Sequence, residues 1–293
     1  MGLSDARGAR AANTVPALGI FAKTFVGATP RDVLRQVRAA GYVCAQYNMA
    51  CSGLGSLPES VPAPAVTALQ EAVRGTGVSL AALSATCNLI HPEAAVRDAG
   101  IRALSTLGGV AGALHIPVLT LCSGSRNRAD QWAWHPDNAG VAAWRALHDS
   151  LDAVLAVLPA HGVQVAIEPE PGNVVDGAVS ARRLLDERGD ARIGIILDPA
   201  NLVGPVLTAP DAERRDRLAA AVELLAGAIV LVHAKDRGAD GSVVAPGDGL
   251  VDFDAFFQAL AGAGVQAPVI THGIGAGDAP RVATWLRERL ALV

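Results

Sequence analysis

Short apolar runs alternate with longer amphipathic segments along this chain, and this alternation limits the folds open to it more than any other feature. The runs recur roughly every 30 to 40 residues, which leaves room for the crossover of a dozen or more residues that joins parallel strands. Strands covered on both faces read as near-continuous apolar stretches, as these do. The eight runs span residues 17–25, 42–49, 78–88, 116–124, 163–170, 192–202, 228–236 and 267–274.

Helical patterns fill the intervals between these runs. Residues 29–41 begin with Thr29 as a cap and Pro30 in the first turn, and they end at Gly41. Eight strand–helix units in 293 residues predict an α/β protein of the (β/α)8 TIM-barrel type. A doubly wound open sheet is the alternative, but residues 21–30 lack the glycine-rich phosphate loop that normally follows its first strand. Further helical patterns cover residues 179–189, 252–264 and 278–290.

Composition indicates one globular domain. The chain is 51% hydrophobic and 18% charged, and no linker or shift in composition divides residues 15–293. Residues 1–14 are polar and alanine-rich without the apolar centre of a signal peptide, so we expect a disordered tail. No run reaches the roughly 18 apolar residues of a membrane span. The net charge of −4, without a block of five like charges, disfavours a nucleic-acid surface.

The cysteines indicate a reducing compartment. None of the four belongs to a CxxC pair, so neither a zinc knuckle nor a redox motif is indicated. Each falls in or just after an apolar run, which is typical of buried free thiols, and we expect a cytoplasmic protein. The four are Cys44, Cys51, Cys87 and Cys122.

Polar side chains recur where the later strands are expected to end. Glu168 ends the fifth run, Asp198 the sixth and His233 the seventh, and His272 lies at the end of the eighth. The successive separations are 30, 35 and 39 residues, one strand–helix unit each. Because the carboxyl ends of all barrel strands meet at one rim, we expect these side chains to be neighbours.

Carboxylates and an imidazole in a partly buried site need a compensating charge. Oxygen ligands with one or two histidines suit one divalent ion, Mn, Mg, Co or Zn. Each residue also has a simpler interpretation: Asp198 precedes Pro199 and can be a turn or cap residue, His233 can be a packed histidine, and Glu168 can be exposed in a Pro-Gly turn. The repetition over three units favours a shared site.

Loop residues leave two more questions open. Lys235 and Asp236 are adjacent and can pair with each other. Trp132 and Trp134 lie in a polar loop, where they can either pack or stack on the face of a sugar. That loop and the one after residue 49 are long, and both lie where a barrel keeps its active-site lid.

Several motifs together resemble the xylose-isomerase-like TIM-barrel superfamily, the sugar phosphate isomerase/epimerase group. The resemblance implies that Glu168, Asp198 and His233 bind a divalent metal and that Glu168 also acts as acid and base. It implies pocket or substrate-binding positions for His91, Trp134, His135, Lys235 and Arg237, and Glu170 is expected to line the pocket or cap the turn. The matching stretches are residues 84–93, 122–138, 166–173, 196–202, 231–237 and 247–253.

The chain departs from the family pattern at the eighth strand. The family usually ends that strand with a glutamate that is the fourth ligand and the second acid/base, and here Thr271 aligns with it. The adjacent His272 takes over both roles if the strand end is bulged or rotated. Otherwise the metal has three protein ligands and water. Asn201 also stands where several members have a histidine.

These residues predict a metal-dependent sugar isomerase or epimerase that removes a proton next to a carbonyl and passes through an enediolate. The missing glutamate gives weight to a lyase or dehydratase acting on a keto-sugar or keto-inositol, and to a degenerate barrel that binds sugar without catalysis. An endonuclease-type phosphodiesterase is less favoured, because it needs many histidine ligands and the chain has seven histidines in all. We expect a small carbohydrate substrate, a role in carbohydrate metabolism with manganese as a candidate ion, and helix faces compatible with a homodimer.

Overall fold

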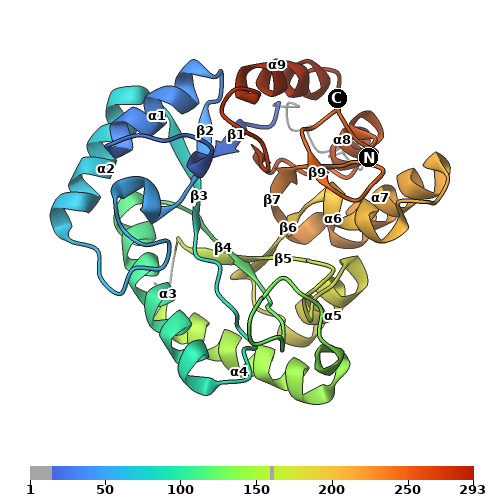
Figure 1. Ribbon diagram of the computed structural model, residues 1–293, viewed down its shortest axis with the longest axis horizontal. Coiled ribbons are helices and arrows are strands. Elements are labelled where there is room, and N and C mark those ends of the chain that lie inside the picture. The colour runs from blue at the N-terminus through green and yellow to red at the C-terminus, as the bar shows by residue number, and fades with distance from the viewer. Residues whose placement is uncertain (1–14, 159–161) are drawn as a thin grey trace, which may run out of the picture.

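A closed barrel of eight parallel strands forms the centre of the molecule (Figure 1). The computed structural model describes residues 15–158 and 162–293, so the predicted tail, residues 1–14, lies outside the described residues. Pairing of β1 with β10 closes the barrel, and each strand lies inside one predicted run, which confirms the (β/α)8 fold. The strands are β1 (Leu18–Phe21), β2 (Cys44–Tyr47), β3 (Ser79–Ser84), β4 (Val118–Cys122), β5 (Gln164–Glu168), β6 (Ile193–Leu197), β7 (Ile229–Ala234) and β10 (Val269–Thr271).

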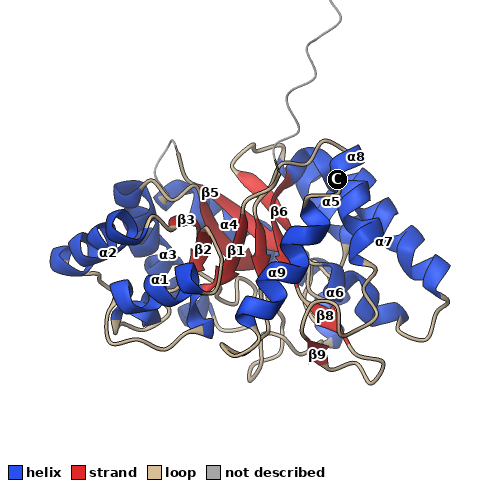
Figure 2. Cartoon of the chain, turned by 90° about the horizontal axis from the view of Figure 1, so that it is seen from above, coloured by secondary structure: helices blue, strands red, loops and turns tan. Residues whose placement is uncertain are grey.

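Helices surround the barrel on its outside (Figures 1 and 2). The long ones are α1 (Pro30–Ala39), α2 (Ala63–Thr76), α3 (Ala94–Leu114), α4 (Val141–Val157), α5 (Ala178–Arg188), α7 (Asp211–Leu225), α8 (Phe253–Gly262) and α9 (Ala279–Leu290). A short helix α6 (Pro199–Val203) follows β6, and a small hairpin of β8 (Asp236–Arg237) and β9 (Val243–Val244) follows β7. Single turns of 3-10 helix are η1 (Ala22–Thr24), η2 (Met49–Ser52), η3 (Pro136–Ala139), η4 (Gly204–Val206) and η5 (Ala226–Ala228).

Local sequence accounts for the start of α1. The Thr29 hydroxyl accepts a hydrogen bond from the backbone N–H of Asp32 at 3.2 Å, and Pro30 occupies the first helical position. The cap satisfies a backbone donor that the helix itself leaves without a partner. Val33 and Val37, four residues apart, are buried against the barrel. The predicted cap is therefore confirmed.

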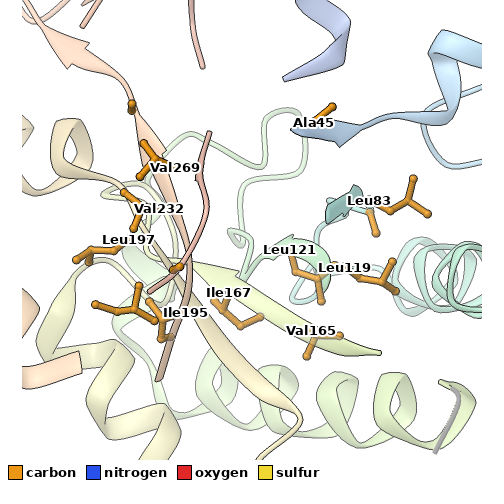
Figure 3. Packing of buried hydrophobic residues seen from close by; sticks show 14 of the residues in the cluster. Ala45, Leu83, Leu119, Leu121, Val165, Ile167, Ile195, Leu197, Val232 and Val269 are labelled. Carbon is orange, nitrogen blue, oxygen red and sulfur yellow. The ribbon is translucent and has the colours of Figure 1, made fainter. Parts of the chain in front are cut away.

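Successive side chains along each strand point alternately into an outer and an inner apolar layer. Side chains of one parity, such as Val165, Ile167 and Leu197, point out toward the helices (Figure 3). Side chains of the other parity form a small inner cluster, with one residue from each of seven strands. On β1 the inward position is Gly19, where a Cβ would lie 2.6 Å from the Cys44 sulfur, so the inner cluster leaves no room for a side chain there. The inner cluster consists of Cys44, Ala82, Val118, Ala166, Ile196, Leu231 and Ile270.

All four cysteines are free thiols, and three of them, Cys44, Cys87 and Cys122, are buried as predicted, whereas Cys51 is half-buried. Burial raises the pKa of Cys44 and of Cys87 to about 12, which keeps both protonated. No helix among the described residues is long and apolar enough to cross a membrane.

Candidate active site

A polar layer lies directly above the inner apolar cluster. Two residues after each member of that cluster, the same face of the strand carries a polar side chain, because side chains alternate with period two. Apart from Asp198, this layer lines the floor of a cavity of about 440 Å³, which Ser56, Leu57, Gln131 and Trp132 line from the two long loops. The layer comprises Gln46, Ser84, Thr120, Glu168, Asp198, His233 and His272, with Phe21 on β1.

Three members of this layer converge on one point. Glu168, Asp198 and His233 are 8%, 2% and 2% exposed, and each offers a ligand atom within 4.8 Å of the others. His233 Nδ1 lies 3.0 Å from Glu168 Oε1 and 4.0 Å from Asp198 Oδ2. Two carboxylates and an imidazole are ligands that divalent metals accept, so this group can hold a metal ion.

Asp198 combines the two roles that its sequence context left open. Its Oδ1 accepts a hydrogen bond from the backbone N–H of Ala200 at 2.9 Å and so caps α6. Its Oδ2 faces the site instead, 2.7 Å from the Nζ of Lys235. The cap fixes the orientation of the carboxylate, so the second oxygen is held toward Glu168 and His233.

Gln46, which sequence reasoning did not single out, orients His233. Its amide nitrogen donates to the hydroxyls of Ser84 at 3.0 Å and Thr120 at 3.4 Å, which leaves its oxygen facing His233 Nε2 at 2.8 Å. His233 Nε2 therefore donates its proton to Gln46, and Nδ1 faces the two carboxylates. An imidazole nitrogen that faces two carboxylates can join them in binding a cation. The signal in the sequence is the position of Gln46, two residues after inward Cys44.

Lys235 brings a positive charge into the cluster. Its Nζ lies 2.7 Å from Asp198 Oδ2, 3.3 Å from Glu168 Oε1 and 3.9 Å from Glu170 Oε1. Burial acts to lower the pKa of Lys235, but the three carboxylates, Asp198 foremost, outweigh burial and raise this pKa above its ordinary value. The ammonium group therefore stays charged.

Asp236 does not pair with Lys235. Its carboxylate accepts four backbone hydrogen bonds at 2.8 to 3.0 Å, which hold the turn after β7 in place. Lys235 is thus free to point into the barrel, two residues beyond His233 on the same face. The four donors are the N–H groups of Arg237, Gly247, Gly249 and Val251.

The neighbouring glutamates differ in protonation. Burial acts to raise the pKa of Glu168, but the charges of His233 and Lys235 and the hydrogen bond with His233 lower it well below the usual range, so Glu168 is ionised. For Glu170, burial and the nearby Glu168 charge raise the pKa to about 8, so it carries a proton at neutral pH. Asn201 donates to Glu168 Oε1 at 3.3 Å and to the carbonyl of Pro169 at 3.2 Å, which fixes the end of β5.

These residues lie in a barrel whose family can be identified. The sequence matches the model of the xylose isomerase-like TIM barrel over residues 34–289. The chain belongs to this family.

Solved structures similar to this xylose isomerase-like chain include several sugar epimerases. A 3-keto-D-glucoside 4-epimerase from E. coli has a TM-score of 0.74 at 16% identity, covering 93% of this chain and 99% of that one. A D-tagatose 3-epimerase-like protein has a TM-score of 0.74 at 17% identity, covering 94% and 98%. A D-allulose 3-epimerase from Methylomonas sp. has a TM-score of 0.70 at 16% identity, with the same coverage. A comparison with curated sequences finds no match.

At the eighth strand of this xylose isomerase-like barrel the inward residue is His272 and not Thr271. Ile270 belongs to the inner cluster, so Thr271 points outward, where its side chain contacts Tyr42. Burial raises the pKa of Tyr42 to about 12, and the Thr271 contact opposes this shift. The His272 ring centroid is 5.1 Å from that of His233, but His272 is not among the three residues whose ligand atoms converge. Burial, followed by the His233 and Lys235 charges, lowers the pKa of His272 to about 3, so its ring is neutral.

Four other residues from the sequence analysis do not line the cavity. His91 is buried, and its ring nitrogens contact the Arg128 carbonyl and the backbone N–H of Glu93. Trp134 is 61% exposed, and the side chain of His135 caps the short helix η3. Arg237 turns away and donates to the carbonyl of Gly241. These four residues lie in the segments that follow the barrel strands, and the pattern of apolar runs does not determine the paths of those segments.

The turn after β5 holds the lid loop over the cavity. Gly172 passes so close to the loop that a Cβ there would lie 1.9 Å from the carbonyl oxygen of Trp132. Asn173 accepts from the N–H of Gly124 at 2.7 Å and donates to the carbonyl of Gln131 at 2.8 Å. Trp132 is thereby placed at the cavity.

Proposed function

We propose that this protein is a sugar isomerase or epimerase that moves a proton on a carbon next to a carbonyl, with a divalent metal ion held by Glu168, Asp198 and His233. The observation that carries the proposal is the convergence of these three buried side chains, two of which, Glu168 and His233, line one cavity. The volume of about 440 Å³ is sufficient for a monosaccharide.

The residues present fit a metal ion. His233 turns Nδ1 toward the carboxylates because its other nitrogen donates to Gln46, and Asp198 presents one fixed oxygen because its other oxygen caps α6. When bound, the ion supplies Lewis acidity to the carbonyl and adjacent hydroxyl of a sugar, which acidifies the C–H bond beside the carbonyl. Manganese, the candidate ion, belongs to the set that such ligands accept.

Glu168 is the proposed base. Its carboxylate is ionised and lines the cavity, so it can take the proton while the electron pair of the C–H bond moves onto the carbonyl oxygen as an enediolate. Return of the proton by Glu168 to the neighbouring carbon gives isomerisation. Protonation from the opposite face gives epimerisation. We propose His272 as the group on that face, because it takes the inward position of the eighth strand and its neutral ring can give one N–H proton to the carbon while its other nitrogen takes a proton from water.

Lys235 and Glu170 are proposed to contact the substrate, because both line the cavity beside Glu168. Trp132 provides an aromatic face at the same cavity, on which the apolar face of a sugar can stack. The epimerase activities of the similar solved structures support a keto-sugar as the substrate class. A cytoplasmic location, a role in carbohydrate metabolism and a homodimer stay predictions.

Hydrogen exchange tests the proposal before the substrate is identified. We would incubate the Mn²⁺-supplemented protein in D₂O with a panel of ketohexoses and 3-keto-glycosides and follow deuterium at the carbons next to the carbonyl by NMR. We expect exchange with at least one sugar, its loss in Glu168→Gln and its retention in the surface control Glu213→Gln. Exchange at the wild-type rate in Glu168→Gln would exclude Glu168 as the base.

One observation favours a second candidate, a lyase or dehydratase on a keto-sugar or keto-inositol. The inward residue of the eighth strand is a neutral histidine and not a carboxylate. The enediolate can then expel a substituent from the next carbon instead of being protonated from the opposite face. The same NMR spectra distinguish the two reactions, because elimination gives a dehydrated product and epimerisation gives a sugar of unchanged mass.

A further inference from the structure

The position between the two buried carboxylates already holds a cation that belongs to the chain. Lys235 Nζ lies 2.7 Å from Asp198 Oδ2 and 3.3 Å from Glu168 Oε1. The side chains of Lys235, Glu168 and Asp198 are only 13%, 11% and 0% exposed. Water therefore screens these charges little, and loss of the ammonium group would leave two buried carboxylates without a counter-charge.

We propose that Lys235 is the resident cation of this site and that a divalent metal binds only by displacing its ammonium group from Asp198 and Glu168. This inference rests on the proposed metal site. It adds that Lys235 sets the metal affinity of the protein and keeps the metal-free site folded.

The metal ion and the Lys235 ammonium group compete for the same oxygen of Asp198. Asp198 has a single oxygen available to the site, because its Oδ1 is taken by the cap of α6. That one oxygen, Oδ2, is the nearest carboxylate atom to Lys235 Nζ. A metal that uses Asp198 needs the same oxygen, so bringing in a metal ion breaks the closest contact of the ammonium group.

The eighth strand offers no negative charge to relieve this competition. His272, an imidazole and not a carboxylate, occupies its inward position, and the ring stacks on Phe21. The carboxylates of Glu168 and Asp198 therefore have to serve either one ammonium group or one metal ion. A carboxylate in place of His272 would allow the Lys235 ammonium group and a metal ion to be neutralised at the same time.

Glu170 gives the displaced ammonium group a second place. Its Oε1 lies 3.9 Å from Nζ, and Glu170 lines the cavity together with Lys235. A small movement of the flexible lysine stem transfers the ammonium group from Asp198 to Glu170. Metal binding then moves a positive charge toward the part of the cavity that receives the substrate.

Metal affinity measured on the full chain tests this directly. We would strip the protein with chelator and titrate it with Mn²⁺, using electron paramagnetic resonance to count free ion. Lys235→Met should bind Mn²⁺ at least tenfold more tightly than wild type, because nothing has to be displaced. Lys235→Arg keeps the competing charge and should stay close to wild type. Lys23→Met removes a cavity lysine that has no ion pair within residues 15–158 and 162–293, and it should also stay close to wild type.

Thermal unfolding gives a second readout. In chelator, Lys235→Met should melt below wild type because two buried carboxylates lose their counter-charge, and Mn²⁺ should restore its melting temperature while changing that of wild type much less. Failure of Lys235→Met to fold even with Mn²⁺ would contradict the idea that a metal can replace the ammonium group.

The outcomes separate this inference from the proposed function. Equal and tight Mn²⁺ binding by wild type and Lys235→Met would overturn the role of Lys235 and leave the metal site standing. Absence of binding in both proteins would overturn the inference together with the metal site.

Discussion

The imidazole ring of His272 stacks on the ring of Phe21, with centroids 4.5 Å apart and planes inclined by 13°. The two residues hold the inward positions of neighbouring strands β10 and β1, so the contact follows from strand pairing. Stacking against Phe21 orients the His272 ring beside His233, and His272 is outside the group whose ligand atoms converge. The geometry therefore places His272 at the cavity and outside the group of three residues that could hold a metal ion.

Removing the stacking partner should harm turnover and spare metal binding. In Phe21→Ala the His272 ring loses its support, and misorientation of a proton-transfer group costs on the order of tenfold or more in kcat. The Mn²⁺ affinity should change less than about twofold, because His272 is not a ligand in this account. Steady-state kinetics and a metal titration on the same preparation check this. A large loss of Mn²⁺ affinity would instead identify His272 as a fourth ligand.

The Gln46 side chain should control metal affinity from outside the ligand set. Gln46→Leu removes the acceptor that fixes the proton on His233 Nε2, and loss of such a partner typically weakens metal binding by about 10- to 100-fold. Ser84→Ala removes one of the two hydroxyls that orient Gln46, so its effect should be smaller. Metal titrations of both variants provide the check, and Gln46→Leu with unchanged affinity would argue against Nδ1 as the ligand atom.

Mutation can distinguish the contributions of the two carboxylate oxygens of Asp198. Asp198→Asn keeps an oxygen that can cap α6 but loses the charge, whereas Asp198→Ala loses both. Both variants should lose Mn²⁺ binding. Asp198→Ala should be less stable than Asp198→Asn by about 1 kcal/mol, the usual contribution of a cap. Urea unfolding measured in chelator gives this difference, and equal stabilities would mean that the cap contributes nothing.

Stability at acidic pH should depend on Glu187, far from the site. Its carboxylate accepts hydrogen bonds from Trp144 at 2.5 Å and Arg183 at 2.7 Å, and the Trp144 bond is the largest cause that lowers its pKa to about 2. Because this folded-state pKa lies below the ordinary value of about 4.5, the stabilisation is fully present above pH 4.5 and is lost as pH falls toward 2. The difference in melting temperature between wild type and Glu187→Gln should therefore shrink over that interval. A difference that does not vary with pH would exclude the charge of Glu187 as its origin.

The barrel and the convergence of three residues of the candidate site could be predicted because both depend on periodic patterns. Continuous apolar runs identify the strands, and the regular spacing of Glu168, Asp198 and His233 places them at one rim. The period-two alternation from Ile270 would also have identified His272 as the inward residue, although alignment by family favoured Thr271.

Other parts of the site depend on contacts between segments far apart in the sequence. Lys235 pairs with Glu168 and Asp198 instead of Asp236 because four backbone N–H groups donate to the Asp236 carboxylate. No local sequence pattern shows these four donors. Gln46 acts on His233 across the barrel, 187 residues away. The loop carrying Trp132 and Trp134 is placed by Gly172 and Asn173, so which tryptophan faces the cavity is a tertiary property.

Anomalous diffraction from a crystal of the wild-type protein soaked in excess Mn²⁺ would test the central claim most directly. The account predicts one anomalous peak within bonding distance of Glu168, Asp198 and His233, with the Lys235 ammonium group moved away from Asp198 toward Glu170. A manganese peak elsewhere in the barrel, or these three side chains unchanged around an ammonium group that no manganese concentration displaces, would contradict it.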